Sequence, residues 1–296
     1  MAGRIAFIGL GNMGGPMAAN LVKGGETVSG FDLSEASCKA AAASGVTISA
    51  SVRAAIEGAD VIVTMLPAGR HVISVWTELL AEAAPGTLLI DCSTIDVDSA
   101  SKAHALAAEH GCLSLDAPVS GGTGGAAAGT LTFMAGGSAD AFSRSEPILK
   151  LMGKRIVHCG DAGAGQAAKI CNNMILGVTM AAVSEAFVLG EKLGLSHQAL
   201  FDVASTSSGQ CWSINSYCPV PGPVPTSPAN HDYKPGFSAA LMLKDLRLAQ
   251  EAALSSGATT PLGAQAAQLY GLFEKLGHGG EDFSAIINFI RGEQAG

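Results

Sequence analysis

Charged residues are scarce in this chain of 296 residues, where they make up 14% of the sequence against 48% hydrophobic residues. The 17 lysines and arginines are scattered and the net charge is −8, so neither a nucleic acid nor an anionic membrane is expected as a partner. The high apolar content predicts large buried cores, and the length predicts two domains.

The cysteines and histidines of the sequence do not have the spacings that are typical of metal sites or of disulfide-rich proteins. Its seven cysteines form no CxxC pair, and its seven histidines show neither HExxH nor another close ligand spacing. An odd number of cysteines, mostly within apolar runs, is typical of reduced thiols. We therefore expect no metal site and a cytoplasmic location.

No signal peptide or membrane span is expected either. The first apolar run, RIAFI at 4–8, meets a glycine turn after five residues and has no cleavage site behind it. A longer apolar stretch at 163–193 is interrupted by Lys169 and two asparagines, which argues against a membrane span.

The stretch at 163–193 has no proline and is expected to form one helix of about 45 Å. Apolar residues cover all its sides, which predicts a buried helix. Lys169 is the only charge between 166 and 184, and Asn173 follows one turn later on the same face. A lysine in a buried helix has three options, because an unpaired buried charge is costly. It pairs with a carboxylate, it extends its side chain so that the amine reaches water, or its amine faces a cleft in which it takes part in a reaction.

The segment 4–32 has the order of strand, glycine turn, helix and strand that a dinucleotide site requires. The turn is GLGNMG, a GxGxxG in which Gly9 turns the chain, Gly11 lets the backbone approach a pyrophosphate and Gly14 lets helix and strand pack closely. Asp32 ends the second strand, where its carboxylate can accept both ribose hydroxyls and would repel a 2′-phosphate, which favours NAD over NADP. The same position is compatible with a helix N-cap.

Further strands are expected at 61–65, 87–90, 112–115, 130–134 and 156–158, separated by helices. The pattern predicts an α/β fold of the Rossmann type, with a doubly wound, mainly parallel sheet. Ligands of such sheets lie beyond the carboxyl ends of the strands. Candidate residues at those ends are Leu66, Pro67, Thr94, Ser120, Gly121 and Gly122.

Four of these candidates have a structural alternative. Ser120-Gly121-Gly122 offers a hydroxyl and unhindered N–H groups to a small carboxylate or phosphate, or belongs to a glycine-rich surface loop that continues to Gly129. Thr94 contacts a cofactor or caps the helix that starts near Val97.

The chain after the long helix is predicted to be all helical, with helices at 198–205, 237–254, 260–275 and 282–290. The segment 212–236 holds half of the prolines, and a loop of this length is either disordered or functional. Trp212, Tyr217 and Tyr233 favour an ordered wall or lid, although packing against the helices explains them equally well. Lys244 and Asp245 interrupt an apolar face, where a solvated pair is the default interpretation.

These patterns predict three parts of the chain. A dinucleotide-binding domain is expected at 1–162, a long connecting helix at 163–193, and an all-helical domain for substrate binding and oligomer contacts at 194–296. The apolar surface of the last two parts suggests that partner subunits cover some of it.

Four motifs together resemble the β-hydroxyacid dehydrogenase family: GLGNMG at 9–14, DAPVSGG at 116–122, GQAAKICNN at 165–173 and FSAALMLKDL at 237–246. The resemblance covers essentially the whole chain. It implies an enzyme that oxidises a small β-hydroxy acid with NAD. The expected substrate is 3-hydroxyisobutyrate, an intermediate of valine catabolism, and the expected product is methylmalonate semialdehyde. L-serine and tartronate semialdehyde or glycerate are alternatives, and a non-catalytic NAD-binding scaffold is a remote one.

The resemblance also implies roles for individual residues. Lys169 matches the general acid/base and Asn173 its catalytic companion. Substrate-binding positions are Ser120, Gly121, Gly122, Trp212, Lys244 and Asp245. Cofactor-binding positions are Gly9, Leu10, Gly11, Asn12, Met13, Gly14, Asp32, Leu66, Pro67, Thr94, Phe237 and Lys244. Members of the family assemble further, so a homodimer or homotetramer is expected.

The expected chemistry agrees with these residue types. Oxidation of an alcohol requires a group that takes the hydroxyl proton as the carbonyl forms. A lysine with its ordinary pKa of about 10.4 is a poor base at neutral pH, but burial and a nearby cation such as Lys244 both favour the neutral amine. The presence of Lys169 therefore favours an enzyme over a scaffold.

Overall fold

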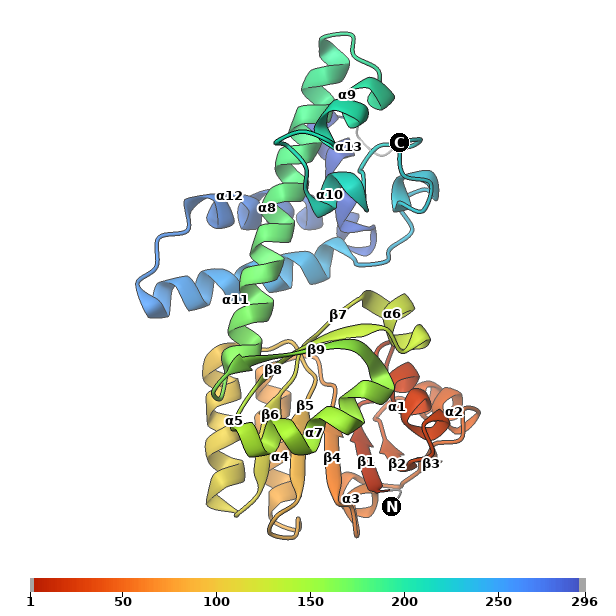
Figure 1. Ribbon diagram of the computed structural model, residues 1–296, viewed down its shortest axis with the longest axis vertical. Coiled ribbons are helices and arrows are strands. Elements are labelled where there is room, and N and C mark those ends of the chain that lie inside the picture. The colour runs from red at the N-terminus through yellow and green to blue at the C-terminus, as the bar shows by residue number, and fades with distance from the viewer. Residues whose placement is uncertain (1–2, 293–296) are drawn as a thin grey trace. The chain divides into compact units, whose positions relative to one another are not determined.

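The computed structural model describes residues 3–292, so the outermost residues of the predicted domains, 1–2 and 293–296, lie outside it. The chain folds into two compact units, one ending at Lys169 and the other beginning at Ile170. The long helix α8, Ala164–Lys192, begins in the first unit and continues into the second (Figure 1).

In the described part of the first unit, nine strands form one sheet in the order β3-β2-β1-β4-β5-β6-β8-β7, with β9 paired to β8. β1 to β6 are parallel to one another, whereas β8 runs antiparallel to β6 and β7. The predicted doubly wound, mainly parallel sheet is thus confirmed. The strands are β1 Arg4–Ile8, β2 Thr27–Phe31, β3 Thr47–Ile48, β4 Val61–Thr64, β5 Leu88–Asp91, β6 Leu113–Asp116, β7 Val119–Ser120, β8 Leu131–Gly136 and β9 Gly153–Gly160.

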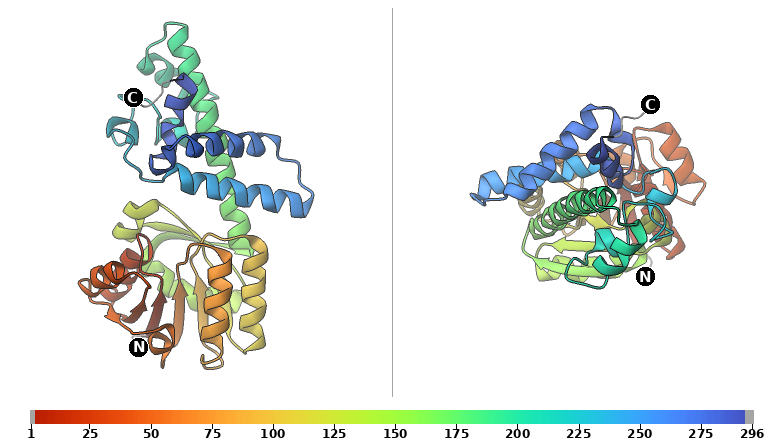
Figure 2. Two further views of the ribbon diagram at one scale, coloured as in Figure 1. Left: turned by 180° about the vertical axis from the view of Figure 1, so that it is seen from behind. Right: turned by 90° about the horizontal axis from the view of Figure 1, so that it is seen from above.

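Helices cover both faces of this sheet, which is why a strand such as β4 is buried at every residue. One face packs against α1, α2, α6 and α7, and the other against α3, α4 and α5. Seen from behind, α4 and α5 lie side by side over the second face (Figure 2). The helices are α1 Gly14–Lys23, α2 Glu35–Ala42, α3 Val52–Ile56, α4 Gly69–Leu80, α5 Val97–Glu109, α6 Gly122–Ala128 and α7 Ala139–Met152.

The long helix forms as predicted but is not buried on all sides in the single chain. Cys171, Ile175, Ala182, Ala186 and Leu189 are exposed and recur at spacings that place them on one face. By length and composition alone α8 could cross a membrane. Its opposite side, however, holds buried polar residues that include Lys169 and Asn173, so α8 packs here as a core helix.

The described part of the second unit is all helical, as predicted. Helices α11 and α12 form an antiparallel hairpin (Figure 1): Gly257, with φ of +72°, ends α11, and Pro261 opens α12. Two apolar clusters pack the hairpin and the end of the chain against α8. The elements are α9 His197–Ala204, α10 Trp212–Asn215, η1 Pro228–Asn230, α11 Ala239–Ser256, α12 Pro261–Lys275, η2 His278–Gly280, η3 Phe283–Ala285 and α13 Ile286–Arg291.

Candidate active site

The glycine turn after β1 has three positions with different requirements. Gly9 has φ of +97°, and a Cβ there would lie 2.2 Å from the carbonyl oxygen of Met65. A Cβ at Gly14 would lie 1.9 Å from the carbonyl oxygen of Gly9, so strand and helix meet closely. At Gly11 a Cβ would meet no atom of the described residues within 4 Å. Gly11 and Asn12 are exposed just before α1. Backbone N–H groups at a helix N-terminus are therefore accessible here, which fits the binding of a pyrophosphate.

Asp32 joins the end of β2 to this turn. Its Oδ2 accepts the N–H of Leu10 at 2.6 Å and its Oδ1 accepts the N–H of Ser34 at 2.7 Å. The N-cap of α2 is Ser34, whose hydroxyl accepts the N–H of Ser37, so the capping alternative for Asp32 is wrong. A carboxylate has further lone pairs on both oxygens, which leaves Asp32 able to accept ribose hydroxyls.

Leu66, Pro67 and Thr94 lie beyond the carboxyl ends of β4 and β5, at the same edge of the sheet as the glycine turn. Ser93 links the two ends, because its Oγ accepts the N–H of Leu66 at 2.8 Å. The N-cap of α5 is Asp96, which accepts the N–H of Ser99 at 2.7 Å, so the capping alternative for Thr94 is wrong.

Asp91, a buried carboxylate for which the residue pattern predicts no role, lies at the end of β5. Its Oδ1 accepts the hydroxyls of Thr64 at 2.7 Å and Ser93 at 2.6 Å. Its Oδ2 has no hydrogen-bond partner within residues 3–292. Burial raises the pKa of Asp91 from 3.8 to about 6, against the opposing effect of those hydrogen bonds.

The start of α8 is tied to the strand ends by two further residues without a predicted role. Asp116, at the end of β6, accepts the N–H of Gly163 at 2.8 Å and of Gln166 at 2.9 Å, and its Oδ1 lies 2.9 Å from Nε2 of His104. The side chain of Gln166 reaches back to the segment after β5. Lys169 lies one turn further along α8 and is only 6% exposed.

The predicted carboxylate loop is partly regular structure. Ser120 ends β7, and Gly121 and Gly122 have φ of +131° and +60° as the chain enters α6. The alternative of a surface loop that continues to Gly129 is therefore wrong for 122–128. The N–H groups at the start of α6 follow directly after the Ser120 hydroxyl, which suits a small anion.

In the second unit, Asn173 donates a hydrogen bond from its Nδ2 to Oδ2 of Asp245, and its Oδ1 accepts from Nδ2 of Asn172 at 2.9 Å. Asp245 is only 4% exposed, so the interpretation of a solvated Lys-Asp pair is wrong for this carboxylate. Lys244, its neighbour on α11, is half-buried.

Trp212 and Phe237, also in the second unit, belong to one row of aromatic rings. Trp212, 51% exposed, stacks on Tyr217 with ring centroids 4.7 Å apart. Tyr217 stacks on Phe283 at 5.4 Å, and Phe237 meets Phe283 edge to face at 5.8 Å. The segment 212–236 is thus ordered by packing against the end of the chain.

The row is anchored by Asp282, another residue that the residue pattern alone did not reveal. Its buried carboxylate accepts the hydroxyl of Tyr217 at 2.9 Å and the N–H groups of Gly236 at 3.0 Å and Phe237 at 3.2 Å. Burial, followed by the nearby Asp282 carboxylate, raises the pKa of Tyr217, which keeps this phenol protonated as a donor.

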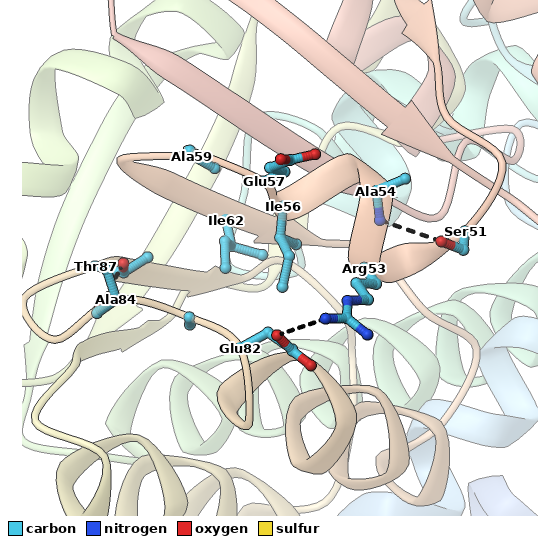
Figure 3. A pocket seen from close by; sticks show the side chains of 12 residues that line it. Ser51, Arg53, Ala54, Ile56, Glu57, Ala59, Ile62, Glu82, Ala84 and Thr87 are labelled. Atoms are coloured by element: carbon cyan, nitrogen blue, oxygen red, sulfur yellow. Dashed lines mark hydrogen bonds and ion pairs between the residues drawn. The ribbon is translucent and has the colours of Figure 1, made fainter.

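A pocket of about 430 Å³ lies at the edge of the sheet opposite to the glycine turn. Figure 3 shows the side chains that line this pocket. It is lined by residues near the amino ends of β4 and β5, such as Ile62 and Thr87, and is bordered by the exposed ion pair between Arg53 and Glu82 at 3.3 Å. None of the predicted site residues lines it. Because ligands of doubly wound sheets lie at the carboxyl ends of the strands, it is separate from the candidate site.

The Rossmann sheet, its glycine turn and Asp32 define the first unit as the NAD-binding domain of an oxidoreductase. Residues 4–160 match the family model described as the NAD binding domain of 6-phosphogluconate dehydrogenase. Residues 163–290 match the model described as NAD-binding of NADP-dependent 3-hydroxyisobutyrate dehydrogenase. The chain belongs to the β-hydroxyacid dehydrogenase family, and it is an NAD-dependent oxidoreductase that acts on CH–OH groups.

Relatives resemble this chain over nearly their whole length. A probable 3-hydroxyisobutyrate dehydrogenase of Mycobacterium tuberculosis is 56% identical over 97% of both chains. A solved structure of the 3-hydroxyisobutyrate dehydrogenase of that organism with L-serine has a TM-score of 0.96 and covers 98% of this chain and 100% of its own. In Pseudomonas aeruginosa, an NAD-dependent L-serine dehydrogenase is 49% identical over 96% of both chains.

Proposed function

We propose that this protein oxidises 3-hydroxyisobutyrate to methylmalonate semialdehyde with NAD, and that Lys169 is the general acid/base. The observation that carries the proposal is the place of Lys169, a buried lysine one turn into a helix whose start is fixed to the carboxyl ends of β5 and β6. That edge also carries the glycine turn and Asp32. A lysine in such a place lies on the side of the sheet where we assign the cofactor and its substrate.

NAD, when bound, supplies the hydride acceptor, and the protein must handle the hydroxyl proton. The amine of Lys169 takes this proton as the carbonyl forms and returns it in the reverse reaction. An asparagine amide has two N–H groups. Asn173 uses one for Asp245 and has a second for the substrate oxygen. The contact supports a role for Asp245 in orienting Asn173 rather than in touching the substrate.

The substrate carboxylate is assigned to Ser120 and to the N–H groups of Gly121 and Gly122. A hydroxyl and backbone donors at a helix start suit a small anion. Leu66, Pro67 and Thr94 are assigned to the cofactor because they lie beyond the strands next to the glycine turn. Trp212, Phe237 and Lys244 remain predictions from the family resemblance.

The test replaces Lys169 with alanine and follows NADH absorbance with 3-hydroxyisobutyrate. We expect kcat to fall at least ~100-fold, the low end for loss of general acid–base catalysis, with the Kd for NAD nearly unchanged. Lys192→Ala is the matched control, because Lys192 is the exposed last residue of the same helix. Activity retained in Lys169→Ala would refute the assignment.

L-serine is the second candidate substrate, because a relative 49% identical to this chain is an NAD-dependent L-serine dehydrogenase. The wild-type protein is assayed with 3-hydroxyisobutyrate, L-serine, glycerate and tartronate semialdehyde side by side. We expect the highest kcat/KM with 3-hydroxyisobutyrate. A higher kcat/KM with one of the other three compounds would make that compound the preferred substrate, and the proposed role of Lys169 would stand.

NAD is proposed as the preferred cofactor over NADP, on the charge of Asp32. A 2′-phosphate would meet this carboxylate where NAD presents a hydroxyl. Asp32→Asn removes the charge and keeps an oxygen that can accept the N–H of Leu10. We expect the ratio of kcat/KM with NAD to that with NADP to fall at least ~10-fold. An unchanged ratio would show that Asp32 does not set the preference.

A homodimer or homotetramer is proposed from the distribution of apolar surface. Apart from Leu33 and Val157, all exposed large apolar side chains of the described residues lie in the second unit, including Ile175 and Leu189 on one face of α8. A second copy covers such a face by closed symmetry. Ile175→Glu with Leu189→Glu is expected to give monomers in analytical ultracentrifugation, whereas Leu33→Glu is not. A monomeric wild type would refute the proposal.

A cytoplasmic location is proposed from the thiols. All seven cysteines are free, and Cys92, Cys112 and Cys218 are buried. Free thiols are typical of reducing compartments. Cell fractionation with an antibody to the protein tests the proposal, and recovery from an oxidising compartment would refute it.

A further inference from the structure

Gln166 joins the cofactor side of the first unit to the helix that carries Lys169. Its side chain is fully buried. Nε2 donates to the carbonyl oxygen of Ser93 at 2.7 Å, and Oε1 accepts the N–H of Ile95 at 3.1 Å. Ser93 and Ile95 are the two neighbours of Thr94, so one side-chain amide holds the backbone on both sides of a residue assigned to NAD.

The backbone of Gln166 is fixed as well. Its N–H donates to Oδ2 of Asp116, while the N–H of Gly163 donates to Oδ1. The first turn of α8 is therefore held by the ends of both β5 and β6. Residues three apart lie on the same face of a helix, so the direction in which Lys169 leaves α8 depends on how Gln166 is held.

We propose that Gln166 is a positioning residue of the active site: its amide sets the amine of Lys169 relative to the cofactor segment at Thr94. The inference rests on the proposed function of Lys169. Two features of the site require glutamine. The carbonyl of Ser93 needs a donor and the N–H of Ile95 needs an acceptor, and a planar amide supplies both.

Gln166→Met is the first test, because methionine has a similar length and no strong donor or acceptor. A displacement of about 1 Å at a reacting group costs about 100-fold in rate. We expect kcat to fall by about 10- to 100-fold and the Kd for NAD to rise by less than that. The control is Ser145→Ala, which removes a buried hydrogen bond of 2.7 Å to the carbonyl of Ala141 in α7 of the same unit. This control is expected to keep the wild-type kcat and Kd.

The pH dependence of kcat in Gln166→Glu distinguishes a positioning role from a role in stability alone. As a carboxylate, Glu offers only acceptors to the carbonyl of Ser93, and when protonated it regains one donor. The kcat of this variant, divided by that of the wild type at each pH, is therefore expected to rise as the pH falls from about 8 to about 6. Soluble, folded enzyme is verified at each pH by circular dichroism.

Lys169→Ala separates the two proposals. If it is inactive while Gln166→Met has wild-type kcat, the role of Gln166 is refuted and that of Lys169 stands. If Lys169→Ala is active, the proposed function itself fails. A Gln166→Met variant that loses no more activity than Ser145→Ala refutes the positioning role too. Should Gln166→Met not fold, a pH-independent ratio for Gln166→Glu refutes it instead.

Discussion

The two units hold their candidate residues by different means. In the first, the turn, the strand ends and the start of α8 are placed mainly by backbone groups, since Asp32, Asp116 and Gln166 all bond to main-chain N–H or C=O. In the second, contacts between side chains are added to backbone ones: Asn173 donates to Asp245, and Tyr217 donates to Asp282, which also accepts main-chain N–H groups. The candidate residues of the first unit are therefore placed mainly by topology, whereas those of the second depend on individual side chains.

Asp282→Ala is the strongest test of this dependence. It removes the acceptor of the Tyr217 hydroxyl and of the N–H groups of Gly236, Phe237 and Ser284. Each buried donor left without a partner costs about 1–3 kcal/mol, so we expect the free energy of unfolding to fall by about 3–5 kcal/mol. Urea unfolding followed by fluorescence measures it, because Trp212 stacks on Tyr217.

The matched control for this variant is Asp202→Ala on α9. Its carboxylate is exposed and accepts from the side chain of Gln198. The change is expected to stay within about 0.5 kcal/mol of wild type. An equal effect of both variants would show that the second unit does not depend on the buried carboxylate.

In the first unit, Asp91 makes stability depend on pH. Because its pKa is raised to about 6 from 3.8, the folded protein keeps a proton that the unfolded chain releases between these values. Its stabilising contribution is therefore full below about pH 4 and is lost as the pH rises through about 6. A shift of this size corresponds to about 3 kcal/mol.

Asp91→Asn removes this titration and keeps an oxygen that can accept from Thr64 and Ser93. The free energy of unfolding of wild type, minus that of the variant, should fall by about 3 kcal/mol between about pH 4 and pH 7. Urea titrations at several pH values measure it, and other titrating groups cancel in the difference. A constant difference would contradict the shifted pKa of Asp91.

Two glycines of the turn after β1 are expected to differ in role: Gly14 matters for stability and Gly11 for NAD binding. Gly14→Ala places a Cβ against the carbonyl of Gly9, and such overpacking costs about 1–3 kcal/mol of stability. Gly11→Ala meets no described atom of the protein, so the Tm should be nearly unchanged. Its methyl group would occupy space that we assign to the pyrophosphate. We expect the Kd for NAD to rise at least ~10-fold, which is about 1.4 kcal/mol.

Calorimetric titration with NAD measures both variants, with wild type as reference. Unchanged affinity in Gly11→Ala would show that the cofactor does not approach the turn at this residue. Loss of stability in Gly11→Ala equal to that in Gly14→Ala would contradict the different surroundings of the two glycines.

The sequence predicted most of what backbone topology determines. The predicted strand at 4–8 has the bounds of β1, and the predicted helix at 163–193 agrees with α8 to within one residue at each end. β3 and β7 were missed because two residues are too short to show alternation. Asp91 and Asp116 lie at the carboxyl ends of strands, where ligands of such sheets are expected. The sequence predicts no role for either, because their hydrogen-bond partners come from other elements.

The side-chain contacts of the second unit were hard to predict because they join residues far apart in the chain, as do the contacts of Gln166 in the first unit. The residue pattern predicts a solvated Asp245, yet its partner Asn173 lies 72 positions away. The hydroxyl of Tyr217 and Asp282 are separated by 65 positions. No local periodicity carries such a pairing, so only the family resemblance, and not the residue pattern, pointed to Asn173 and Asp245 together.

Serine N-caps are expected to contribute equally to the stability of both units. Ser34 caps α2 in the first unit and Ser196 caps α9 in the second, each by accepting an N–H three residues on. A cap is a local interaction that does not depend on topology or on distant side chains. We therefore expect Ser34→Ala and Ser196→Ala to lower the free energy of unfolding by a similar amount, about 1 kcal/mol each. Urea unfolding measures both, and a clear inequality would mean that the difference between the units extends to their local structure.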